Sequence, residues 1–256
     1  MYGLPRALSP PLNSPAAAAP WLRAALALAL AAAVLMALVA AGWHPLLRVD
    51  GTVAVRLHSW ALHHPGWTET NRVLSDWVWD PLTMRLVLLA AALWLWLRGE
   101  RLLALWCVAT AAVGTGLQQG LKTALDRERP HWQHPVDSAH YSAMPSGHAM
   151  TAMITYFLAV WLVRRSGAPA RAWVPVLALG CVTVVGVCLT RIALGVHWLT
   201  DTVAGSLLGA ALAAAAVGVW NAWLPAGPRN GPGEGRGPDA PEEQEWRDGQ
   251  DNDRRT

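Results

Sequence analysis

Six apolar runs separated by short polar segments dominate the sequence between residues 24 and 223. About 20 apolar residues in a helix are enough to span the hydrocarbon core of a bilayer. The pattern therefore predicts an all-α fold, an integral membrane bundle of six transmembrane helices. The fourth run is short, so its helix is expected to begin near Ser146 and to recess the polar residues there. The runs cover residues 24–43, 81–97, 102–121, 149–163, 172–189 and 202–223.

The segments outside these runs have a different composition. Residues 1–20 are rich in Pro and Ala, and residues 225–256 are rich in Gly, Pro and charged side chains. Both are predicted to be disordered, because such segments cannot bury enough apolar surface to fold. This leaves residues 21–224 as one transmembrane domain. Residues 44–80 mix charged side chains with four tryptophans, which predicts an amphipathic helix along the membrane surface and not a span.

The overall composition supports a membrane protein. Hydrophobic residues make up 54% of the chain and charged residues 14%, whereas a soluble domain has about 25% charged residues. The net charge of +3 is small and no basic run occurs, so nucleic acid is not an expected partner. The expected partners are membrane lipids, and the sequence indicates no oligomeric state.

Loop charges predict the topology. The two short turns at 98–101 and 164–171 carry five arginines, and Arg23 precedes the first apolar run. By the positive-inside rule, these segments should be cytoplasmic. Six spans then place both termini in the cytoplasm of a multi-pass plasma-membrane protein. The alternate loops, which carry the polar clusters described next, should face the outside.

The third polar cluster contains Arg191, Gly195, His197 and Asp201. His197 and Asp201 are four residues apart, a spacing that puts two side chains on one face of a helix. Gly195 should break the chain, so that Arg191 ends one helix and His197 opens the next. A histidine whose second nitrogen is held by a carboxylate can act as a nucleophile toward phosphorus.

The second cluster, Pro145-Ser146-Gly147-His148, resembles an anion cradle at a helix start. Ser146 is a candidate N-cap, and Gly147 allows backbone N–H groups to approach a phosphate. His148 would then lie in the first turn, where it could protonate a leaving oxygen.

The first cluster adds positive charge. Lys122 and Arg129 are seven residues apart and would share a face if the helix persists to Pro130. With Arg191 they could surround a phosphoryl group and stabilise its transition state. No cluster of carboxylates suited to Mg²⁺ accompanies them. We therefore predict a reaction without a metal or other cofactor.

The three clusters resemble the tripartite signature of the type 2 phosphatidic acid phosphatase (PAP2) superfamily. That signature is Lys, six residues and Arg-Pro; then Pro-Ser-Gly-His; then Ser-Arg, five residues, His, three residues and Asp. Thr190 stands in place of the family serine and retains a hydroxyl group. The soluble vanadium haloperoxidases share the signature, but the six apolar runs favour the membrane branch. The matching positions are Lys122, Arg129, Pro130, Pro145, Ser146, Gly147, His148, Arg191, His197 and Asp201.

The resemblance implies a PAP2/haloperoxidase-like core and a role for each residue. His197 would be the nucleophile that forms a phosphohistidine, Asp201 would orient it, and His148 would be the general acid. The phosphate would be held by Lys122, Arg129, Ser146, Gly147 and Arg191.

The function expected from the sequence is hydrolysis of a lipid phosphate or pyrophosphate. Candidate substrates are phosphatidic acid, phosphatidylglycerol phosphate and undecaprenyl pyrophosphate. Two alternatives stay open. A lipid phosphotransferase would use the same phosphohistidine, and a catalytically silent membrane protein would bind lipid phosphates without reaction.

Overall fold

The computed structural model describes residues 15–223, and these residues form helices and no strand. The predicted disordered tail at 225–256 and the first part of the predicted lead, residues 1–14, lie outside the described residues. The helices are α1 (Pro15–Ala40), α2 (His44–His63), α3 (Pro65–Val73), the π-helical turn η1 (Leu74–Val78), α4 (Pro81–Leu97), α5 (Arg101–Leu125), α6 (Gly147–Arg165), α7 (Ala170–Ala193) and α8 (Leu199–Trp223).

Four of these helices are long and apolar enough to cross a membrane: α1, α5, α7 and α8. A fifth span is obtained if Pro65–Val78 and α4, which are bent by 40° at their junction, count as one broken span. Each of the six expected runs does form a helix, but six membrane spans are not confirmed. The fourth run, now α6, is not among the candidates, because Gly147 and His148 at its start and Arg164 and Arg165 at its end lower its mean hydropathy.

The first helix begins at Pro15, earlier than the expected start near residue 24. The described end of the predicted disordered lead, residues 15–20, is therefore helical. Proline is well tolerated in a first turn, where its missing N–H has no intrahelical partner, and the four alanines that follow are the strongest helix formers. The prediction of disorder for residues 15–20 was wrong because the run of four alanines favours a helix more than the prolines disfavour it.

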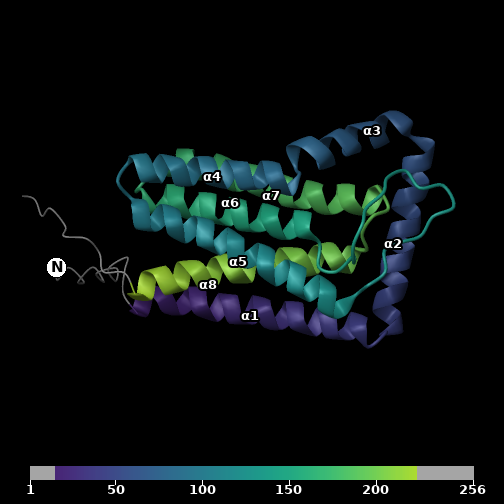
Figure 1. Ribbon diagram of the computed structural model, residues 1–256, viewed down its shortest axis with the longest axis horizontal. Helices are drawn as coiled ribbons and strands as arrows, with labels where there is room; N and C mark the ends of the chain where they lie inside the picture. Colours follow the sequence, from purple (N-terminus) through teal and green to yellow (C-terminus); the bar gives the residue numbers. More distant parts are fainter. Residues whose placement is uncertain (1–14, 224–256) are drawn as a thin grey trace, which may run out of the picture. The chain divides into compact units, whose positions relative to one another are not determined.

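Helix α8 lies at the centre of the packing, with α1 running along it and α6 crossing close to it (Figure 1). Small residues allow the close approach of α8 to α6. A Cβ atom added at Gly205 would lie 2.4 Å from the backbone oxygen of Ser146, and one at Gly209 would lie 2.7 Å from that of Met150. In a membrane, such small-residue contacts replace the hydrophobic driving force between helices. They also place the start of α6 against the first turns of α8.

The polar clusters gather at one end of the helices. Helix α2 runs across this end, and the connection 126–146 folds over it, whereas the arginine-bearing turns α4–α5 and α6–α7 lie at the other end (Figure 1). The expected surface segment 44–80 is α2, α3 and η1, and α2 is not a candidate span. Its second half, Pro65–Val78, passes the test for a span together with α4, so the prediction that none of 44–80 is a span stays open there.

We predict that Gly205→Ala destabilises the fold and Gly116→Ala does not. The new methyl group at residue 205 meets a backbone oxygen, which cannot move like a flexible side chain, so we expect a loss of about 1–3 kcal/mol. Gly116 is exposed on α5 with open space around it, and Ala there should change stability by less than about 1 kcal/mol. Unfolding midpoints in detergent measure both. Equal midpoints for the two variants would contradict the close α6–α8 contact.

Candidate active site

The turn between α7 and α8 carries His197. Helix α7 ends at Ala193, and Gly195 adopts a φ of +74°, a left-handed conformation that costs glycine little. His197 follows in the connection, two residues before α8 begins at Leu199. The break predicted at Gly195 is therefore observed. His197 lies just outside α8, and not inside it as expected.

His197 faces Asp201 in the first turn of α8. The Nδ1 atom lies 3.3 Å from Oδ2 of Asp201, and both side chains are buried. An N–H at Nδ1 that donates to this carboxylate leaves the lone pair on Nε2. Burial, followed by the charges of Arg191, Arg129 and Lys122, lowers the pKa of His197 well below its usual value. The imidazole is thus neutral at pH 7, the state that a nucleophile requires.

Asp201 is held by donors other than His197. Arg127 donates to Oδ1, and the backbone N–H of Trp198 donates to Oδ2 at 2.8 Å. The Arg127 guanidinium also stacks on the Trp198 ring, with 5.6 Å between its central carbon and the ring centroid. Two donors besides His197 therefore hold the carboxylate in an orientation that faces His197.

A second buried carboxylate, Asp50 of α2, completes this network. Arg127 donates to its Oδ2 at 2.7 Å, so one guanidinium bridges two carboxylates. Asp50 also accepts from the backbone N–H of Thr200 at 2.9 Å and from its hydroxyl at 2.6 Å. It therefore caps the N-terminus of α8 from another helix. We call Asp50, Arg127, Thr200 and Asp201 the carboxylate network.

Sequence reasoning missed Asp50, Arg127 and Thr200. Arg127 lies inside the first cluster, two residues before Arg129, and was passed over because it falls outside the signature. Asp50 is the one acidic residue within α2, on the expected surface segment. The single acid in this helix was the available signal for Asp50. Its partner, Arg127, is 77 positions away and could not be inferred from the sequence.

The second cluster lies beside the turn between α7 and α8 that carries His197. Ser146 occupies the N-cap position of α6, as expected, but its side chain makes no capping bond. Its backbone N–H instead donates to the backbone oxygen of Asp201 at 2.9 Å, which joins the second and third clusters. The Ser146 hydroxyl is buried and makes no hydrogen bond within the protein. Gly147 lies against Gln118, where an added Cβ would approach the amide nitrogen to 3.2 Å.

His148 lies in the first turn of α6, as predicted, and is largely buried. Its Nε2 lies 3.9 Å from Oδ2 of Asp80, the N-cap of α4, whose Oδ1 accepts from the backbone N–H of Leu82. Asp80 is a further acidic neighbour that the sequence did not single out. Burial and then the charges of Arg191, Lys122 and Arg129 lower the pKa of His148, so an acid role for His148 requires the negative charge of a bound phosphate beside it.

The three expected cations come from different segments. The Lys122 ammonium donates to the backbone oxygen of Ser142 at 2.7 Å, and Arg191 donates to the Ser75 hydroxyl at 2.7 Å. Arg129 donates to the backbone oxygens of Val196 and Tyr141, and its NH1 nitrogen lies 3.3 Å from Nε2 of His197.

The expected helical register of Lys122 and Arg129 is wrong. Helix α5 ends at Leu125, because Asp126 turns to a left-handed φ of 37°. Instead, the loop after α5 folds back and brings the two cations together. Arg129 holds this loop by donating to the backbone oxygen of Val196, in the turn between α7 and α8. All three cations lower the pKa of His197, so they do share one site.

An open polar basin of about 840 Å³ adjoins the site. Lys122, Arg127, Arg129 and Val196 are among its lining residues, whereas the two histidines are not. The basin thus gives solvent access to Lys122 and Arg129, but not to Arg191 or to the two imidazoles. Within residues 15–223, no three His, Cys, Asp or Glu side chains are grouped as metal ligands, and the absence of a metal cofactor stays a prediction.

Comparisons with known proteins agree with this arrangement. The fold and site define a helical membrane protein with the three clusters of a phosphate-handling family. The model of the PAP2 superfamily matches residues 101–224, and the predicted resemblance is confirmed: this part of the chain belongs to the PAP2 superfamily. A search of the curated proteins finds no match.

One solved structure shares the fold. It is the crystal structure of a transmembrane PAP2-type phosphatidylglycerolphosphate phosphatase from Bacillus subtilis. The TM-score is 0.64 at 21% sequence identity, over 74% of this chain and 92% of that one. The fold is therefore that of a membrane PAP2 protein.

The carboxylate network can be tested by Asp50→Asn. The substitution leaves the bridging guanidinium with less compensating charge in a buried place, and we expect it to cost at least about 2 kcal/mol. Glu69→Gln is the matched control, because it neutralises an acid in the exposed Arg72 pair, worth about 1 kcal/mol or less. Thermal unfolding in detergent compares the two. Similar losses for both would show that the buried network adds nothing to stability.

Proposed function

We propose that the protein is a metal-independent phosphatase that hydrolyses a lipid phosphate or pyrophosphate through a phosphohistidine on His197. The observation that carries the proposal is the surroundings of His197: a carboxylate at Nδ1, the Arg129 guanidinium 3.3 Å from Nε2, and two further cations acting on the ring. The Ser146 hydroxyl and Nε of Arg191 are buried without a hydrogen-bond partner among residues 15–223. Such donors are normally satisfied, and phosphate oxygens would satisfy both.

In the first half-reaction, the Nε2 lone pair of His197 attacks phosphorus. The bond between phosphorus and the leaving oxygen breaks, and that oxygen takes a proton from His148. Asp201 stabilises the positive charge that develops on the imidazole through its bond to Nδ1. Lys122, Arg129 and Arg191, with the Ser146 hydroxyl and the Gly147 backbone, hold the phosphoryl oxygens, as a metal ion does in other phosphoryl transfers.

In the second half-reaction, a water molecule attacks the phosphohistidine. His148, now neutral, accepts a proton from this water as the P–N bond breaks. Inorganic phosphate leaves, and His197 returns to its neutral state. His148 therefore gives one proton to the leaving oxygen in the first half-reaction and regains one from water in the second, while His197 keeps its Nδ1 proton throughout.

The substrate is proposed to be a lipid whose head group reaches the end of the bundle where α2 lies. Phosphatidic acid, phosphatidylglycerol phosphate and undecaprenyl pyrophosphate are the candidates, and the name of the Bacillus subtilis protein adds weight to the second. The arginine-bearing turns lie at the opposite end (Figure 1). By the positive-inside rule, this supports an active site on the outer side of the plasma membrane and cytoplasmic termini.

We predict that purified protein releases phosphate from at least one of these lipids in the presence of EDTA. His197→Ala should lower the rate by about 10⁴-fold or more, because removal of a nucleophile leaves only positioning and electrostatics. His63→Ala is the control, since His63 is exposed at the end of α2 and should leave the rate unchanged. Loss of the wild-type rate in EDTA would contradict the metal-independent reaction.

A phosphotransferase is the second candidate, because the open basin beside Arg129 has room for an acceptor other than water. We predict that hydrolysis dominates. With the lipid substrate and added glycerol, most of the phosphoryl group should appear as inorganic phosphate, and glycerol phosphate should be a minor product. Preferential formation of glycerol phosphate would favour the transferase. No turnover by folded wild-type protein with any of the three lipids would favour a silent lipid-phosphate-binding protein.

A further inference from the structure

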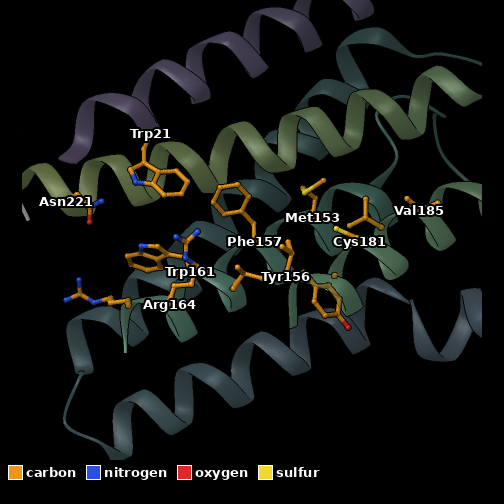
Figure 2. Close-up of a pocket in the computed structure, with 14 residues that line it drawn as sticks. Trp21, Met153, Tyr156, Phe157, Trp161, Arg164, Cys181, Val185 and Asn221 are labelled. Carbon is orange, nitrogen blue, oxygen red and sulfur yellow. The ribbon is translucent and has the colours of Figure 1, made fainter. Parts of the chain in front are cut away.

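A second concave site lies away from the histidines, between α1, α6, α7 and α8. It is a groove of about 590 Å³, within the roughly 300–1,000 Å³ of small-molecule sites. Figure 2 shows Phe157, Trp161 and Met153 of α6 along it, with Trp21 of α1 and Val185 of α7 on the facing helices. Apart from arginines at one end, its walls are mostly apolar, which suits a hydrocarbon chain.

The length of the groove corresponds to one leaflet. Its lining residues on α6 run from Met153 to Arg165, twelve positions that extend about 18 Å at 1.5 Å per residue. The hydrocarbon core of a bilayer is about 30 Å thick, so half of it is about 15 Å. A chain that starts at the Arg164 end would therefore reach the middle of the membrane near Met153.

The charged end of the groove is made by Arg164 and Arg165. The central carbon of the Arg164 guanidinium lies 4.9 Å from the Trp173 ring centroid, and that of Arg165 lies 5.5 Å from the Trp220 centroid. Ring faces therefore help to place both cations at the mouth. Among the described residues that line the groove, Arg164 and Arg165 are the charged ones, and no Asp or Glu occurs. Asn221, buried on α8, adds an amide at the same end (Figure 2).

We propose that this groove binds an anionic phospholipid of the leaflet nearer Arg164, with the head group on Arg164 and Arg165 and one acyl chain between α6 and α7. Basic residues at the membrane surface attract anionic head groups by about 1 kcal/mol each, which selects the lipid by charge as well as by shape. The arginine mouth of the groove and His148 lie at opposite ends of α6, so the head-group site is separate from the proposed active site. The bound lipid fills the groove and contacts α1, α6 and α7 there.

Native mass spectrometry of the full chain tests the proposal, with phosphatidylserine and phosphatidylcholine of identical chains as probes. Both are phosphodiesters, so neither is a monoester substrate of the proposed phosphatase. We expect the first phosphatidylserine to bind about tenfold or more tighter than phosphatidylcholine, given two arginines at the mouth. Arg164→Gln with Arg165→Gln should remove this preference. The matched control is Arg98→Gln with Arg101→Gln, which neutralises the other turn at the same end and should preserve it.

The apolar part of the groove is tested separately. Cys181 is exposed and lines the groove, so Cys181→Trp should fill it and weaken binding of the first phosphatidylserine by about tenfold or more. Val182 is the next residue, is 64% exposed and does not line the groove, so Val182→Trp should leave binding unchanged. Equal binding of the two lipids by the wild type, equal effects of the two tryptophans, or a dimer in which a second copy excludes lipid would each overturn the proposal. None of these outcomes depends on phosphatase activity.

Discussion

The buried carboxylate of Asp201 is the constraint on which the site depends. A carboxylate that is fully removed from water must be compensated by charge and hydrogen bonds, or it will take up a proton. Arg127 supplies the charge, and the Trp198 N–H and His197 supply further contacts. Only 13% of the Arg127 side chain is exposed, and a second acid, Asp50 of α2, pairs with the same guanidinium. The buried charge of Asp201 beside His197 thus accounts for the contacts of Arg127 and, through Arg127, of Asp50.

The hydrogen bonds that compensate these buried charges link segments that are distant in sequence. Asp50 caps α8 through Thr200, so the helix that crosses the end of the bundle also fixes where α8 begins. The backbone oxygen of Asp201 accepts from Ser146, so the start of α6 is set by the same turn. Gly205, one turn later on α8, allows that approach because it has no Cβ. A buried ion network of this kind contributes more to a single defined geometry than to stability, and a phosphoryl-transfer site requires such geometry.

The sequence predicted the helical membrane fold, and its predictions of local structure differ in outcome between the clusters for physical reasons. The break before His197 was predictable because glycine is the preferred residue in a left-handed turn. The contact of His197 with Asp201 was predictable because the two residues are only four positions apart. The relation of Lys122 to Arg129 was wrong because Asp126 ends α5 early, and a left-handed aspartate carries no strong signal. Asp50 could not be found, since pairing across 77 positions depends on how α2 packs. Six spans remain a prediction, because four of the described helices, or five with the bent pair, are long and apolar enough to cross a membrane.

The central claim is that His197 accepts the phosphoryl group. The most direct measurement is rapid quenching of the wild-type protein with a lipid phosphate under alkaline conditions, which preserve phosphohistidine, followed by mass spectrometry of the peptide that contains residues 191–201. The structure predicts one phosphoryl group on His197, formed in EDTA and lost when the reaction is chased with unlabelled substrate. A phosphoryl group on His148 or on another residue, or turnover with no phosphorylated peptide at any quench time, would contradict the account.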